Sequence, residues 1–141
     1  MSDYSYFETT ADIGIEVVSS NIEDAFMYSA VACFNLITDV DMIEENIRKE
    51  VPVSSEDEYA LLYDWITELL ILFDGEFFVA NSYDVKINMD DDGYHLSARL
   101  LGDVYDTSKY CYKTEVKAIT YHNMEITEDK NEYRVRFIVD L

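Results

Sequence analysis

The residues best placed for chemistry are acidic side chains near the two ends of the chain. Asp12 stands just before residues 13–17, an alternating run, and is out of phase with their apolar face. Asp140 is likewise out of phase with the apolar positions of 135–139, and Leu141 follows it with an α-carboxylate. If the first and last strands are neighbours in a sheet, three carboxylates converge. Such a cluster repels itself unless a hard cation or a lysine neutralises it.

Two other patterns resemble binding or catalytic motifs without completing them. Residues 88–93 resemble the start of an EF-hand loop, with oxygen-bearing side chains at alternate positions and Gly93 at the sixth. The twelfth position of such a loop needs a bidentate glutamate, but here it is Arg99. Because the flanks are strand-like, we interpret this segment as a hairpin turn. His95 and His122 are the only histidines, and neither has a second His or Cys at ligand spacing. A His-based metal centre or a Ser-His-Asp triad therefore has no local signature.

Composition and charge are those of an acidic, folded, single-domain protein. The chain has 141 residues, 30 Asp and Glu against 10 Lys and Arg, a net charge of −20 and 49% hydrophobic residues. This length suits one domain over residues 1–141, and aromatic residues at 14% argue against disorder. The acidic excess disfavours DNA or RNA binding through phosphates. Without a signal peptide or an 18-residue apolar span, we expect a cytoplasmic location and no membrane contact.

The cysteines and glycines exclude further classes of site. Cys33 lies in an apolar run, as small core thiols do, and Cys111 is distant from it in the chain. Neither a disulfide framework nor a zinc cluster can be built from this pair. The four glycines are scattered, so no glycine-rich loop is available to cradle a phosphate.

Hydrophobic periodicity predicts an α+β protein: β-α-β-α followed by antiparallel strands, with two main helices against sheet. Capping boxes at 20–23 and 55–58 are expected to begin the helices. The second helix is apolar around most of its circumference and should be sandwiched between other elements. Residues 42–49 fit either a loop or a short helix. The expected elements are a strand at 12–19, a helix at 21–36, an edge strand at 50–53, a helix at 56–73, a hairpin of 85–89 with 95–101, and strands at 115–120, 124–127 and 133–141.

Four sequence blocks resemble the archease family. They are FETTADIGI at 7–15, LLYDWITELL at 61–70 with LFD at 72–74, EVKAITYHNME at 115–125, and VDL at 139–141. The blocks run from end to end of the chain in the family's order, and the third is very specific. The chain is therefore identified as resembling an archease over its whole length.

The resemblance implies a function and a site. Archeases are non-catalytic activators of the RtcB-type RNA ligase, which joins tRNA halves after intron removal; they promote its guanylylation and its repeated turnover. The family fold is a three-layer β/β/α arrangement. Its divalent-cation site falls on Asp12, Asp140 and main-chain oxygen of Leu141, and Lys117 matches a functionally important lysine. The resemblance thus implies Ca²⁺, Mg²⁺ or Mn²⁺ on oxygen ligands, no catalytic residue, and the ligase as partner, with RNA contacted only through it.

One position departs from the family pattern, and two other functions stay open. The family signature commonly reads His-Thr-Ala-Asp, whereas Thr9 stands here in place of the histidine. Threonine neither titrates near neutral pH nor offers a nitrogen ligand, so a role for that histidine does not carry over. The alternatives are a metal-dependent phosphoester hydrolase that uses the same carboxylates, with His122 as its sole candidate base, and a general chaperone, which needs an exposed apolar surface.

Overall fold

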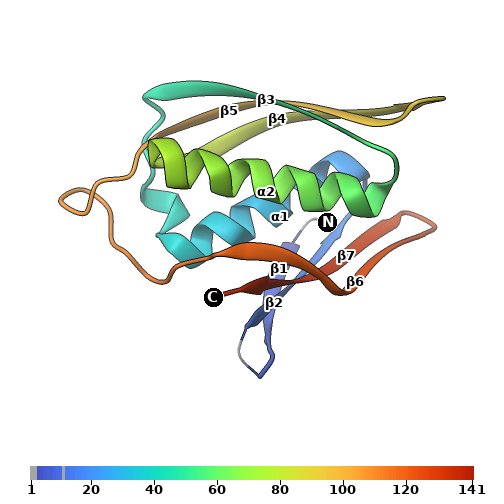
Figure 1. Ribbon diagram of the computed structural model, residues 1–141, viewed down its shortest axis with the longest axis horizontal. Coiled ribbons are helices and arrows are strands. Elements are labelled where there is room, and N and C mark those ends of the chain that lie inside the picture. Colours follow the sequence, from blue (N-terminus) through green and yellow to red (C-terminus); the bar gives the residue numbers. More distant parts are fainter. Residues whose placement is uncertain (1–2, 11) are drawn as a thin grey trace.

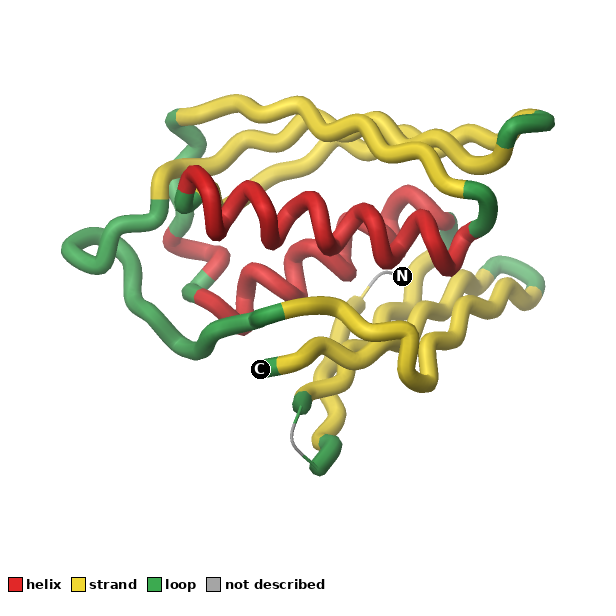
Figure 2. Tube along the Cα trace, viewed as in Figure 1, coloured by secondary structure: helices red, strands yellow, loops and turns green. Residues whose placement is uncertain are grey.

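The computed structural model describes residues 3–10 and 12–141, whose strands and helices form three layers (Figures 1 and 2). One sheet has three strands in the order β3-β5-β4, and the other has four in the order β1-β2-β7-β6. Every pairing is antiparallel. The elements are β1 (Asp3–Glu8), β2 (Ile13–Ser19), α1 (Ile22–Ile37), a 3-10 helix η1 (Val40–Met42), β3 (Ile47–Ser55), α2 (Glu58–Glu76), β4 (Phe78–Asp90), β5 (Gly93–Val104), β6 (Ala118–Asp129) and β7 (Glu132–Asp140).

The two helices lie between the sheets, and each contacts strands of both (Figure 1). Glu58, at the start of α2, accepts hydrogen bonds from Tyr94 of β5 and from Tyr133 of β7, so one carboxylate joins the two sheets. The α+β class and the two helices against antiparallel sheet are confirmed. The three-layer arrangement that the resemblance implied is present as well, with the helical layer in the middle. The reason is the wide apolar surface of α2, which buries Leu61, Leu62, Trp65, Ile66, Leu69 and Leu70.

Both helices begin later than the capping boxes predict. The Asn21 side chain accepts a hydrogen bond from the Asp24 N–H at 2.8 Å, and the Asp57 carboxylate accepts one from the Ala60 N–H at 2.8 Å. Asn and Asp are as good N-cap residues as Ser, so Asn21 and Asp57 take the N-cap positions instead of the nearby Ser20 and Ser55. The second helix also extends past residue 73 to Glu76. Neither helix in residues 3–10 and 12–141 is long and apolar enough to span a membrane.

The strand predictions need corrections at β3 and at β6. Residues 47–49, expected in a loop or a short helix, form the start of β3. Residues 115–117 precede the sheet, and the two strands expected at 115–120 and 124–127 form the single strand β6. A bulge explains the break in alternation: Thr120 pairs with Ile138 but Glu125 pairs with Arg136, so residues 121–124 lie opposite one residue of β7. The hairpin turn between β4 and β5 and the edge position of β3 are confirmed.

A buried carboxylate fixes the loop that leads into β6. Asp103 is 8% exposed, and its Oδ2 accepts hydrogen bonds from Lys109 Nζ at 2.8 Å and from the Tyr110 hydroxyl at 2.6 Å. These bonds, the one from Lys109 first, lower the pKa of Asp103 from 3.8 to about 2. The folded protein therefore keeps this carboxylate ionised at acidic pH values at which the unfolded chain begins to protonate it.

We expect Asp103→Asn to lower the free energy of unfolding by about 2 kcal/mol at pH 7, because charge-assisted hydrogen bonds are lost. The folded pKa lies below the unfolded one, so this stabilisation is present above about pH 4 and lost as the pH falls towards 2. Urea unfolding of both proteins at pH 7 and pH 2 measures the effect. An equal difference between the two proteins at both pH values would contradict it.

Candidate functional site

The two ends of the chain meet at one end of the four-stranded sheet. Strand β2 pairs with β7, with Ile13 opposite Val139, and the same register continued by one residue sets Asp12 opposite Asp140. On the other side of β7, Ala118 of β6 pairs with Asp140. Figure 1 shows the C-terminus beside the start of β6 and close to the β1–β2 hairpin. The strand that follows Asp12, β2, and the last strand, β7, are thus neighbours, which is the condition for the two carboxylates to converge.

Lys117 joins this group through its backbone. Its N–H donates a hydrogen bond to the Asp140 carbonyl at 2.8 Å, which continues the β6–β7 ladder by one step. The register sets Lys117 opposite Leu141, and both residues are exposed. Because the Asp140 carbonyl is engaged, the main-chain oxygen left for a ligand is that of Leu141. We call Asp12, Lys117, Asp140 and Leu141 the acidic tip.

The residues of the acidic tip fit a hard cation. Asp12 and Asp140 are half-buried, and within the described residues neither carboxylate forms an ion pair. Two such carboxylates across adjacent strands repel each other, and a divalent cation relieves that repulsion. No group of three His, Cys, Asp or Glu side chains suited to a metal occurs among residues 3–10 and 12–141. Further ligands to a cation at this position would have to be main-chain oxygen or water, a set that would suit Mg²⁺, Ca²⁺ or Mn²⁺.

Thr9, the residue that departs from the family pattern, holds the backbone of Asp12. Its hydroxyl oxygen accepts a hydrogen bond from the Asp12 N–H at 3.2 Å. This contact closes the loop between β1 and β2, whose last pair is Glu8 with Ile13. Ala11, which belongs to the first family block, lies outside the described residues. Threonine thus contributes to the tip by positioning its neighbour, without titrating or binding metal through nitrogen.

Replacing Thr9 with valine should weaken binding of Mn²⁺ by about fivefold, because one neutral hydrogen bond that orients Asp12 is lost. Thr9→Ser is the matched control, since it keeps the hydroxyl acceptor and should bind as the wild type does. Calorimetric titration with MnCl₂ measures both affinities. Equal affinities for the valine and serine variants would show that the hydroxyl has no positioning role.

Among the described residues, neither histidine forms a hydrogen bond or an ion pair with the acidic tip. His95 lies on the other sheet, where its Nδ1 is 2.9 Å from Ser54 Oγ and its Nε2 is 2.9 Å from Asp90 Oδ1. These three residues come from three strands, which is why the sequence showed no such group. The ring is reversed relative to a serine hydrolase, in which Nε2 faces the serine, and Ser54 and Asp90 are exposed. His122 is exposed in the β6 bulge, and its Nε2 is 3.3 Å from Asn123 Nδ2.

Comparison with known proteins settles the family. The model of the Archease protein family (MTH1598/TM1083) matches residues 4–141. The chain belongs to the archease family. It is 36% identical to the protein archease of Methanothermobacter thermautotrophicus over 141 residues, which cover all of both chains. It is 41% identical to the protein archease of Pyrococcus abyssi over 126 residues, 89% of each chain.

Solved archease-family structures share the fold. The solution structure of Methanobacterium thermoautotrophicum protein 1598 aligns with a TM-score of 0.85 at 36% identity and covers 98% of both chains. The crystal structure of an archease, possible chaperone, from Thermotoga maritima aligns with a TM-score of 0.63 over 96% of this chain and 94% of that one. At 17% identity the latter shows the fold alone. Both likenesses agree with two helices and two antiparallel sheets.

Proposed function

We propose that this archease is a non-catalytic activator of an RtcB-type RNA ligase, and that its acidic tip acts at the ligase's active site. The observation that carries the proposal is the register of β2, β7 and β6, which sets Asp12 opposite Asp140 and Lys117 at the same sheet end. Asp12 lies between β1 and β2, and the other three residues lie at the start of β6 and the end of β7. Lys117 and Leu141 are exposed, so a partner can approach this sheet end. The family resemblance supplies the ligase as the partner.

The roles of the tip residues follow from their chemistry. Asp12, Asp140 and the main-chain oxygen of Leu141 would hold a divalent cation, which when bound supplies neutralising charge for phosphate oxygens. Lys117, exposed beside them, offers a second positive charge to the same anionic groups. Asp140 ends β7 and Asp12 directly precedes its partner strand β2, so the backbone spacing of the two residues is set by that pairing before the partner arrives. This arrangement suits guanylylation, in which a nucleotide phosphate is transferred to the ligase.

The charge of the chain favours a protein partner over free RNA. A net charge of −20 repels the phosphates of RNA, whereas a ligase that binds RNA needs a basic face. Opposite charges on two proteins accelerate their encounter and orient it before contact. The acidic surface therefore guides this chain to the enzyme, and RNA is reached through the enzyme.

The test is guanylylation of the purified ligase with GTP and Mn²⁺, in the presence and absence of this chain. We expect faster formation of guanylylated ligase, and more than one RNA joined per ligase molecule. Unchanged rates would overturn the proposal. The isolated chain should release no phosphate from nitrophenyl phosphate with Mn²⁺, because in the described part of the chain neither histidine is hydrogen-bonded to the tip as a base. Hydrolysis by the isolated chain would favour the phosphoester hydrolase alternative instead.

A further inference from the structure

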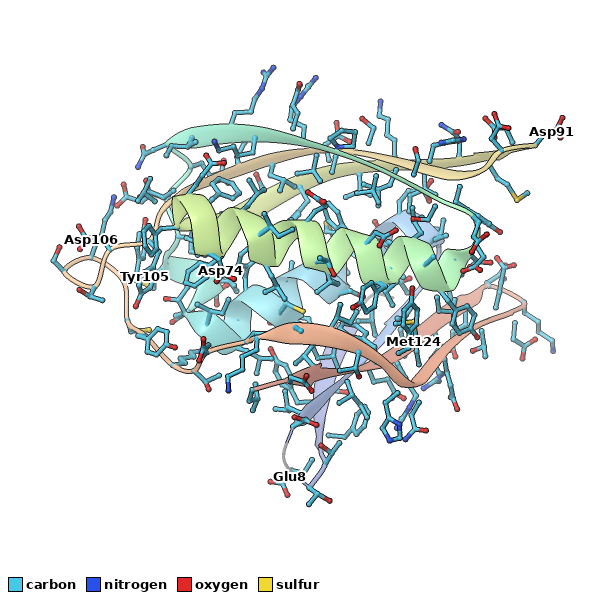
Figure 3. The ribbon with its side chains drawn as sticks, in the orientation of Figure 1. Glu8, Asp74, Asp91, Tyr105, Asp106 and Met124 are labelled. Atoms are coloured by element: carbon cyan, nitrogen blue, oxygen red, sulfur yellow. The ribbon has the colours of Figure 1, made fainter. Side chains whose placement is uncertain are left out.

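The bulge of β6 turns a short segment outward next to the acidic tip. Residues 121–124 lie opposite one residue of β7, and Asn123 adopts a left-handed backbone with φ 55°. The side chains of residues 121–123 are exposed, whereas Met124 is 9% exposed and lies between β6 and α2 (Figure 3). The bulge thus anchors itself through Met124 and presents the three preceding side chains to solvent.

Tyr121 is held there as a flat, half-open aromatic surface. Its ring stacks on that of Tyr63 from α2, with centroids 4.4 Å apart and planes 2° apart. Tyr63 is half-buried in the helix, so it fixes the orientation of the outer ring. Tyr121 is nevertheless 53% exposed, so a large part of the side chain stays open to solvent although one ring face stacks on Tyr63. An aromatic face presented in this way is a binding surface for a cation or for another planar group.

Carboxylates near the ring decide which planar group suits it. Tyr121 stacks on Tyr63 of α2, Asp64 is the next residue of that helix, and Asp57 and Glu56 stand at its start. In agreement with this placement, burial raises the pKa of Tyr121, and the negative charges of these acids raise it further. Two of them are held in place: Asp64 Oδ2 accepts a hydrogen bond from Ser55 Oγ at 2.6 Å, and Asp57 caps α2. A nucleobase brings a phosphate that these acids repel, and a second copy of the chain brings more negative charge.

We propose that the open face of Tyr121 binds an arginine side chain of the ligase, with Asp57, Asp64 and Glu56 as the surrounding negative charges. The planar guanidinium stacks on aromatic rings and pairs with carboxylates, and it is more weakly hydrated than an ammonium group. Tyr121 follows Ala118, the residue opposite Asp140, by three positions along β6, or about 10 Å of strand. This spacing along β6 is short enough for one partner protein to contact both the acidic tip and Tyr121. The proposal rests on the proposed function in naming the ligase as the partner.

The experiment measures the dissociation constant of the full chain for the purified ligase by calorimetry, without RNA. Tyr121→Leu should weaken binding roughly 5- to 10-fold, whereas Tyr121→Phe keeps the ring and should stay within about twofold of the wild type. Tyr112→Leu is the matched control, because Tyr112 is a tyrosine of similar exposure at 55%, and it should bind as the wild type does. Thermal unfolding of each variant verifies that it is folded.

Each other outcome would overturn the proposal. Wild-type binding by Tyr121→Leu would show that the ring is not a contact, and equal losses in the leucine and phenylalanine variants would assign the effect to the hydroxyl. Binding of hexauridine RNA by the chain alone, lost in Tyr121→Leu, would assign the ring to a nucleobase. Failure of the wild-type chain to bind the ligase overturns this proposal and the proposed function together, whereas the preceding outcomes leave the proposed function standing.

Discussion

Replacing Asp140 or Asp12 with asparagine should lower the affinity of this archease for Mg²⁺, Mn²⁺ or Ca²⁺ by at least about tenfold. Loss of a group that only supports a ligand already costs 10- to 100-fold in many metal sites, and here a charged ligand itself is removed. Asparagine keeps one oxygen at the site but removes the negative charge that attracts the cation. Calorimetric titration of each variant with the three chloride salts measures the loss.

The same variants should not lose thermal stability in the absence of metal. The register sets the half-buried Asp12 opposite the half-buried Asp140, and neither has an ion-pair partner in the described part of the chain, so removal of one charge should relieve repulsion. Asp91→Asn is the matched control, since it makes the same change of charge on the β4–β5 hairpin, far from the tip (Figure 3). If Asp140→Asn and Asp91→Asn bind cations equally well, the tip is not the metal site.

Truncation of Trp65 should give the largest loss of stability. The side chain is fully buried between the sheets, and its Nε1 donates a hydrogen bond to the Phe26 carbonyl of α1 at 2.9 Å. Trp65→Ala removes that bond and leaves a large cavity, at a cost of about 3 to 5 kcal/mol. This is a substantial share of the roughly 5 to 15 kcal/mol that holds a typical domain folded. Urea unfolding followed by circular dichroism measures it.

A substitution on the other side of the same helix separates packing from helix propensity. Ile71 is 55% exposed, so Ile71→Ala should change the free energy of unfolding by no more than about 0.5 kcal/mol. Because alanine favours the helix in both variants, the difference between them isolates the buried contacts of Trp65. Comparable losses at the two positions would contradict the placement of α2 between two sheets.

The elements with strong periodicity could be predicted from the sequence. The alternation before Ser19 and after Glu132 defined β2 and β7, and the near-complete apolar surface of α2 indicated that it is sandwiched. The sequence predicted that Asp12 and Asp140 converge only if their two strands are neighbours, because the phase of residues within a strand does not show which strands pair. The pairing of Ile13 with Val139 supplies that condition.

What the sequence could not show depends on contacts between distant segments. The β6 bulge exists because Met124 turns into the core while Thr120 and Glu125 keep their pairs on β7, and alternation of residue types alone made it look like a break between two strands. The hydrogen bonds of His95 to Ser54 and Asp90 depend on the register of three strands. The role of Thr9 depends on the loop conformation that brings its hydroxyl to the Asp12 N–H.

The most direct measurement is the rate of ligase guanylylation with the wild-type chain and with the Asp12→Asn/Asp140→Asn double variant, each at a concentration that saturates the ligase. The wild type should accelerate guanylylation, and the double variant should leave the rate at that of the ligase alone while still binding the enzyme through surfaces such as Tyr121. Stimulation by the double variant equal to that by the wild type would contradict the assignment of the acidic tip as the activating site.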